Sequence, residues 1–262
     1  MNYLYFGSWL GLLFLGTGCV TSHKAATLTH EDQLRLEKSV ALPTAQLEKR
    51  FKRVKDVEVT RYLNQLGHRL LEVSSELQVS LVDVVLIQNK GDLWRNYSFP
   101  KGSIYLSVDL LKQLKWENEI VALLALQIAH LSQKSVFIRV QELYEEQANA
   151  PTFKNQASFE WPQFVQSLSW DKDGIFDFSV KTEEAAIKTA VQLLYLSGYD
   201  ARGLISLYLT YQNQSNYSPY AREVLGELLG FARQEVAFYP PLRNPIVASP
   251  KYLFIHKRIQ NL

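Results

Sequence analysis

Residues 117–133 read ENEIVALLALQIAHLSQ, and this stretch decides how the chain folds. Its length and its run of apolar residues predict a long helix. Leu126 extends the apolar face formed by Leu123, Leu124 and Ile128. A helix this apolar is expected to be buried in a core. We therefore place it at the centre of the fold.

The segments on both sides of this helix predict a small sheet and further helices. Residues 80–88 (SLVDVVLIQ) and 103–108 (SIYLSV) are β-branched and extended, which favours two strands. Apolar residues at helical spacing predict one long helix over 47–77, interrupted near Asp56. Further helices are expected over 110–114, 182–196, 201–212 and 220–236, with a short one in the tail. The fold class is thus α+β and mostly helical.

Composition excludes several classes of protein. The 262 residues include 28 basic and 26 acidic side chains, and 47% of them are hydrophobic. That much apolar material argues against disorder, and a net charge of +2 gives no electrostatic case for nucleic acid. One cysteine cannot form an intrachain disulfide. With five histidines, any metal site must be small and must use a carboxylate.

The lone cysteine lies at the end of an apolar N-terminal run. Residues 3–18 carry no charge and suit a signal peptide better than a membrane span. Gly16, Thr17 and Gly18 precede Cys19 and resemble a bacterial lipobox, in which the cysteine is lipidated. The alternative is a short anchor helix with a buried cysteine. We expect a signal peptide over 1–18 and a lipidated tether over 19–45. The domain itself then covers 46–262, with an irregular insertion at about 146–178.

Four sequence segments in order carry the chemistry. Residues 96–106 (NYSFPKGSIYL) precede the central helix, which contains LQIAH at 126–130. SVKTEEAAI follows at 179–187, and SGYD at 197–200. Together they resemble the zinc metalloprotease family of the CAAX prenyl-protein protease and the heat-shock protease HtpX, most closely its periplasmic lipoprotein branch. That family carries HExxH on one helix and ExxxD on a later one.

The resemblance implies a metallopeptidase-like domain and assigns roles to individual residues. Two histidines one helical turn apart and a later glutamate bind zinc, and the glutamate after the first histidine is the general base. The second histidine falls on His130 and the later glutamate on Glu183. The first histidine falls on Leu126, and the general base on Gln127.

These substitutions indicate a degenerate site. Leucine has no lone pair for a metal, and a glutamine amide cannot accept the proton of a zinc-bound water. The aspartate of ExxxD falls on Ile187, and a His-Pro pair near the family's C-terminus falls on Ser249-Pro250. We expect no cofactor, and zinc only if the site is functional.

Ordinary structural roles remain open for the two retained residues. His130 could be a helix histidine satisfied by one hydrogen bond, with Glu183 its partner. Glu183 could be a solvated residue in the first turn of a helix, where carboxylates are favoured.

The 96–106 segment corresponds to the strand on which active family members bind an extended peptide. Its candidate peptide-binding residues are Asn96, Phe99, Pro100, Gly102 and Ile104. The alternative is that the strand serves only folding.

These observations lead to one main hypothesis about function and two alternatives. We expect an inactive metalloprotease homologue on the periplasmic side of the bacterial envelope, anchored to the outer membrane through Cys19. Its expected partners are extended peptides or envelope proteins, and no nucleic acid. The alternatives are an active zinc metalloendopeptidase with a non-standard site and a structural envelope lipoprotein.

Overall fold

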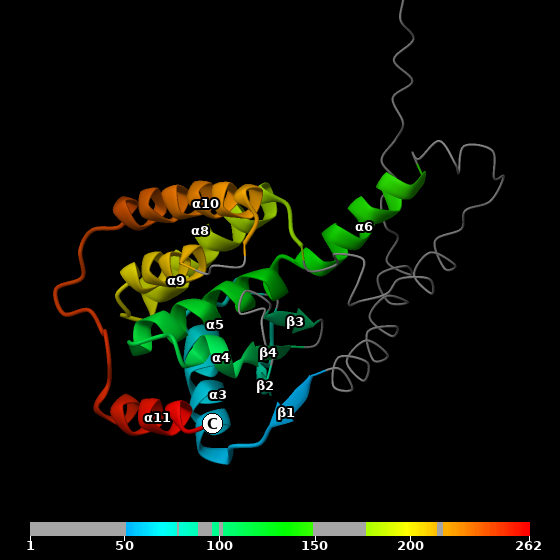
Figure 1. Ribbon diagram of the computed structural model, residues 1–262. Helices are drawn as coiled ribbons and strands as arrows, with labels where there is room; N and C mark the ends of the chain where they lie inside the picture. Colours follow the sequence, from blue (N-terminus) through cyan, green and yellow to red (C-terminus); the bar gives the residue numbers. More distant parts are fainter. Residues whose placement is uncertain (1–50, 78, 89–95, 100–101, 149–176, 214–216) are drawn as a thin grey trace, which may run out of the picture.

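The computed structural model describes residues 51–77, 79–88, 96–99, 102–148, 177–213 and 217–262. The expected signal peptide, the tether and residues 149–176 of the expected insertion lie outside this part of the chain. Within it, helices predominate and pack on a small sheet (Figure 1), which confirms the α+β, mostly helical class. The helices are α3 (Val57–Glu72), α4 (Val108–Leu111), α5 (Glu117–Ser132), α6 (Ser135–Ala148), α8 (Val180–Leu196), α9 (Arg202–Gln212), α10 (Pro219–Phe238) and α11 (Pro250–Gln260).

Helix α5 lies at the centre, as its sequence predicts. Every residue from Glu117 to His130 is buried, with the polar residues at the two ends of this run and at Gln127. Helices α8 and α9 pack along α5, α10 packs on α8 and α9, and α3 contacts α5 from another side. Full burial of each aliphatic side chain contributes about 1.5–3 kcal/mol, so this packing dominates the stability of the domain.

The sheet has four strands in the order β1-β2-β4-β3. Strand β4 is the parallel neighbour of β2 and the antiparallel neighbour of β3, and β1 pairs antiparallel with β2. Strands β1 and β3 therefore form the two edges. The bounds are β1 (Lys52–Val54), β2 (Asp83–Gln88), β3 (Tyr97–Phe99) and β4 (Ser103–Ser107).

One predicted element is wrong. The helix expected over 47–77 begins only at Val57, and Lys52–Val54 before it is strand β1. Asp56, where an interruption was expected, is the N-cap of α3 and accepts a hydrogen bond from the Val59 N–H at 3.0 Å. A three-residue strand is too short to show the alternation typical of strands. The helical periodicity downstream of Asp56 therefore hides the strand before it.

The C-terminal tail is held by backbone hydrogen bonds. The Ile246 N–H donates to the Gly198 carbonyl at 2.8 Å, and the Ile246 carbonyl accepts from the Asp200 N–H at 3.0 Å. The next carbonyl, of Val247, accepts from the Asn118 N–H at the start of α5. The tail thus joins the α8–α9 turn to the first turn of the central helix.

Among the described residues, no single helix is long and apolar enough to cross a membrane. Helix α5 and the start of α6 are long and apolar enough only when they are taken together, and the two helices meet at an angle of 58°.

Two helical glycines provide a test of the packing around α5. A Cβ added to Gly203 of α9 would lie 2.4 Å from the Asn118 carbonyl oxygen, whereas one added to Gly230 of α10 meets nothing within 4 Å. We expect Gly203→Ala to lower the free energy of unfolding by about 1–3 kcal/mol through overpacking. Gly230→Ala should raise it by up to about 1 kcal/mol through helix propensity. Urea denaturation measures both, and equal effects would contradict the close contact of α9 with α5.

Candidate functional site

The structure brings His130 and Glu183 together. His130 lies in the last turn of α5, and Glu183 lies in the first turn of α8, which runs beside it. The His130 Nε2 atom is 3.5 Å from Glu183 Oε2, and the two side chains are 3% and 13% exposed. Glu183 is therefore not a solvated first-turn carboxylate; it faces a buried imidazole.

The contacts of His130 fix its ring on two further sides. Its Nδ1 atom lies 3.0 Å from the Ser135 hydroxyl oxygen, at the start of α6. The Phe178 ring lies against the imidazole, with 4.5 Å between centroids. Gln133 joins the two helices by donating hydrogen bonds to the Ala185 carbonyl and the Thr189 hydroxyl of α8. These contacts hold the imidazole and the carboxylate in one geometry.

The aligned substitutions are also buried in this region. Leu126 is one helical turn before His130, is 5% exposed and belongs to the hydrophobic core. Gln127 follows it and is 7% exposed. Ile187, one turn after Glu183, is fully buried in the same core. Aliphatic side chains thus occupy two positions at which the zinc family has polar residues.

A buried tyrosine of α9 completes the surroundings of Glu183. Burial raises the pKa of Tyr208 well above its ordinary value, and the negative charge of Glu183 raises it further. Burial likewise raises the pKa of Tyr211, while a hydrogen bond with Asn96 opposes this shift. Glu183, whose side chain is 13% exposed, thus faces an imidazole and lies near a buried phenol.

The residues present do not fit a catalytic zinc ion. Such a site needs three protein ligands, usually histidine, cysteine or carboxylate side chains, and one open position. Of the aligned positions, only His130 and Glu183 carry a side chain of these types. Among the described residues, no group of three or more histidine, cysteine, aspartate or glutamate side chains is placed to hold a metal. His68 and His256, the other described histidines, lie on α3 and α11.

Fewer residues lie at the edge of the sheet than the sequence predicts for a peptide-binding strand. Ile104 and its strand β4 lie between β2 and β3, so the backbone of β4 is already paired on both sides. Phe99, Gly102 and Ile104 are buried, and Pro100 lies outside the described residues. Asn96 accepts a hydrogen bond from the Ser107 N–H. In the part of the chain that the structure describes, only β3 leaves an outer edge without a paired strand on this side of the sheet.

Ser249 lies at the opposite end of α5 from His130. The Ser249 N–H donates to the Glu117 carboxylate, which also accepts a hydrogen bond from the Tyr199 hydroxyl at 3.1 Å. Tyr62 lies within 3.5 Å of the Ser249 hydroxyl. Burial and the charge of Glu117 raise the pKa of Tyr199. The Ser249-Pro250 pair therefore takes part in a structural network, far from the His130–Glu183 contact.

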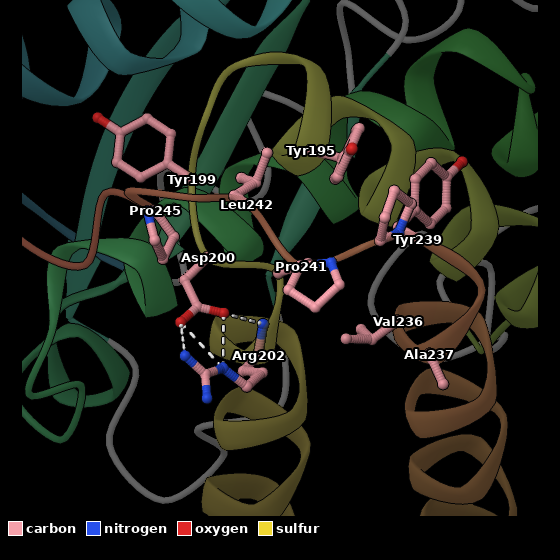
Figure 2. A pocket seen from close by; sticks show the side chains of 12 residues that line it. Tyr195, Tyr199, Asp200, Arg202, Val236, Ala237, Tyr239, Pro241, Leu242 and Pro245 are labelled. Atoms are coloured by element: carbon pink, nitrogen blue, oxygen red, sulfur yellow. Dashed lines mark hydrogen bonds and ion pairs between the residues drawn. The ribbon is translucent and has the colours of Figure 1, made fainter.

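A pocket of about 360 Å³ opens near this same end, between the α8–α9 turn, the end of α10 and residues 239–245. Figure 2 shows Tyr195, Tyr239 and several prolines along its wall, with the Asp200–Arg202 pair at one side. The Tyr195 and Tyr239 rings are 4.8 Å apart. Arg202 donates hydrogen bonds to both carboxylate oxygens of Asp200. The pocket and the His130–Glu183 contact lie at opposite ends of α5.

Sequence reasoning did not single out Ser135 as a contact of His130. Ser135 is five residues from His130, beyond the end of α5, where Lys134 takes a positive φ of 54°. No helical spacing joins the two positions. Phe178 is the last residue of the expected insertion, and no pattern in that segment marks it.

The site joins a histidine in the last turn of α5 to a glutamate in the first turn of α8. No family model matches the chain. The chain is 25% identical over 224 residues to a protein from Yersinia pestis named beta-barrel assembly-enhancing protease, across 78% of this chain and 44% of that protein. Proteins of the same name from Escherichia coli O157:H7 and K12 are 24% and 23% identical over 183 residues, 66% of this chain and 36% of theirs. The chain thus spans less than half the length of these relatives.

The ion pair beside the pocket makes a pH-dependent prediction. Hydrogen bonds from the Arg202 side chain hold the pKa of Asp200 below its ordinary value of 3.8, although burial opposes this. A carboxyl group with a lowered folded pKa stabilises the protein above its unfolded pKa, and this contribution is lost as the pH falls through the folded value. Wild type should therefore lose free energy of unfolding more steeply than Asp200→Asn below pH 3.8.

Urea denaturation at a series of pH values measures this difference between the two proteins. Because the other carboxyl groups are shared, their titration cancels in the comparison. A difference that stays constant from neutral pH to below pH 3 would contradict the stabilising role of the pair.

Proposed function

We propose that this chain is a protease-like protein of the bacterial envelope that has lost peptidase chemistry and acts by binding polypeptides. One observation carries the proposal: His130 and Glu183 face each other at 3.5 Å, and Leu126, one turn before His130, is buried in the hydrophobic core. The similarity to bacterial proteins named as proteases supports the protease-like part.

The loss of activity follows from the chemistry of the replaced side chains. A peptidase of this type needs a base beside the metal-bound water, and the amide of Gln127 cannot accept that proton. With two protein ligands in place of three, a metal would be held weakly. His130 already contacts Ser135 and Glu183, so its nitrogens are engaged without a metal.

Polypeptide binding is proposed for the outer edge of β3. All three residues of this strand are buried, so this edge would have to open for a peptide to add to it. An extended peptide can add to a sheet edge through main-chain hydrogen bonds, which needs no catalytic group. The names of the relatives refer to assembly of β-barrels, and an unfolded outer-membrane protein is the corresponding extended ligand. A protein without peptidase activity can therefore still bind a peptide at an edge strand.

Location in the envelope is proposed from the N-terminal sequence. Lipidation of Cys19 would hold the domain on the periplasmic side, at the outer membrane, with residues 19–45 as tether. A structural envelope lipoprotein would share this anchor but would bind no peptide.

Metal content separates the inactive protein from an active zinc peptidase. Purified residues 20–262, which retain every described element, should contain no stoichiometric zinc after dialysis and should not cleave an unfolded protein. The rebuilt variant Leu126→His/Gln127→Glu places two histidines one turn apart on α5 opposite Glu183, so it should bind zinc.

The control variant carries His130→Ala in addition to the two substitutions of the rebuilt variant. It should no longer bind the zinc that the rebuilt variant binds. Zinc is measured by mass spectrometry of the dialysed protein, and cleavage is measured with and without a chelator. Stoichiometric zinc in wild type together with chelator-sensitive cleavage would overturn the proposal.

Hydrogen exchange tests peptide addition at β3. An unfolded outer-membrane protein segment should slow amide exchange in residues 97–99, because a strand added to β3 would hold it in the paired state. Residues 52–54 of β1, at the other edge of the same sheet, provide the internal control and should not change. Binding without protection of 97–99 would place the peptide elsewhere, and an absence of binding would favour the structural lipoprotein.

A further inference from the structure

We propose that the outer surface of α11, together with β1 and the start of α3, binds an anionic membrane surface. This surface, called here the α3–α11 face, combines exposed apolar side chains with basic ones. It lies along the lower side of the molecule in Figure 1, where α11, the start of α3 and β1 come together, while α10 lies along the upper side. Nothing in the proposal depends on the state of the His130–Glu183 site.

Helix α11 is amphipathic in an unusual way, because its outward side is also partly apolar. Tyr252, Ile255 and Ile259 are buried against the domain. On the opposite side, Leu253 is 69% and Phe254 is 62% exposed. Exposing two large apolar side chains next to each other is costly unless they meet another apolar phase.

Basic side chains surround these apolar residues. Lys257 and Lys251 flank them on α11 and are exposed. The Lys251 ammonium also donates a hydrogen bond to Gln65 at 3.0 Å. Lysines in this position keep their ammonium groups at the lipid headgroups while their stems and the neighbouring Phe and Leu enter the interface. This arrangement is typical of helices that lie on an anionic bilayer.

The adjoining β1–α3 region extends the positive surface. Val57 at the start of α3 is 68% exposed. The two carboxylates of this region are both paired, since Arg258 of α11 binds Asp56 at 2.7 Å and Arg61 binds Glu58 at 2.8 Å. At the start of α3, the two described carboxylates are thus both paired, and α11 carries no acidic side chain.

A pocket beside this face suits lipid headgroups. It measures about 530 Å³ between β1, α3 and β2, and its lining includes Arg53 and Lys55. Asp56 and Arg61 also line it, each paired with an oppositely charged side chain. Strand β1 is also where the chain enters the domain from the N-terminal residues that carry Cys19. A lipid-anchored chain would therefore enter the fold on the same side as this basic and apolar surface. These features favour a phospholipid surface over an acidic protein.

The consequence is a second membrane contact besides the lipid. A basic and apolar patch would add a second contact with the bilayer to the lipid on Cys19. Contact through α11 and β1 would also orient the domain, because α10 lies on the side away from them.

Vesicle binding of residues 20–262 tests the proposal without the lipid. The protein should sediment with phosphatidylglycerol-containing vesicles, should not sediment with neutral phosphatidylcholine vesicles, and should be released by high salt. The variant Lys251→Gln/Lys257→Gln/Phe254→Ser should partition at least about thirty-fold more weakly, since each lysine near an anionic surface contributes about 1 kcal/mol.

A matched control variant changes two cations and one exposed aromatic residue on α10: Arg222→Gln/Arg233→Gln/Tyr220→Ser. It should bind within about two-fold of wild type, because charge acts on the bilayer only within a Debye length. Circular dichroism melting confirms that both variants are folded. Equal loss in the two variants, equal binding to neutral vesicles, or no binding to phosphatidylglycerol vesicles would overturn the proposal.

Discussion

The burial of α5 on all sides is the constraint on which the rest of this structure depends. A helix that is apolar all round must be covered all round, and α3, α8, α9 and the sheet each supply part of that cover. The polar groups at its two ends must then be satisfied inside the protein. These residues are Glu117, Asn118 and Glu119 at one end and His130 at the other. Each of them is at most 7% exposed. Both polar clusters of the domain are therefore consequences of one buried helix.

Sequence patterns anticipated the elements with strong periodicity or strong apolar character. The central helix, strands β2 and β4, and helices α8 to α11 follow from runs that are long enough to show their period. Strands β1 and β3, of three residues each, carry no such signal, and only pairing with β2 and β4 defines them. The extent of α6 and its junction with α5 depend on the positive φ of Lys134, which no residue preference announced.

The candidate site was anticipated in part for a similar reason. The order of the sequence motifs predicts that His130 and Glu183 lie close together, because residues at the same spacing on a helix lie on the same face in any chain. The environment did not follow from the motif: Ser135 and Phe178 contact the imidazole from other segments. Leu126 and Ile187 belong to the hydrophobic core, so much of the region beside the His130–Glu183 contact is apolar. The sequence predicts peptide binding along the whole 96–106 segment, but β4 within it is paired on both sides. That pairing is a property of the assembled sheet and leaves no local pattern in the sequence.

The tail contact with the first turn of α5 has a consequence for how the protein is made. Ser249 donates to Glu117 across 132 positions of sequence, and Val247 accepts from Asn118 over a similar distance. During synthesis, the buried end of the central helix stays without these partners until residues 247–249 have left the ribosome. Such non-local contacts slow folding and make it cooperative. A chain truncated before Ile246 would leave the Glu117 carboxylate buried without its tail partner, and would be a substrate for quality-control proteolysis rather than a smaller version of the domain.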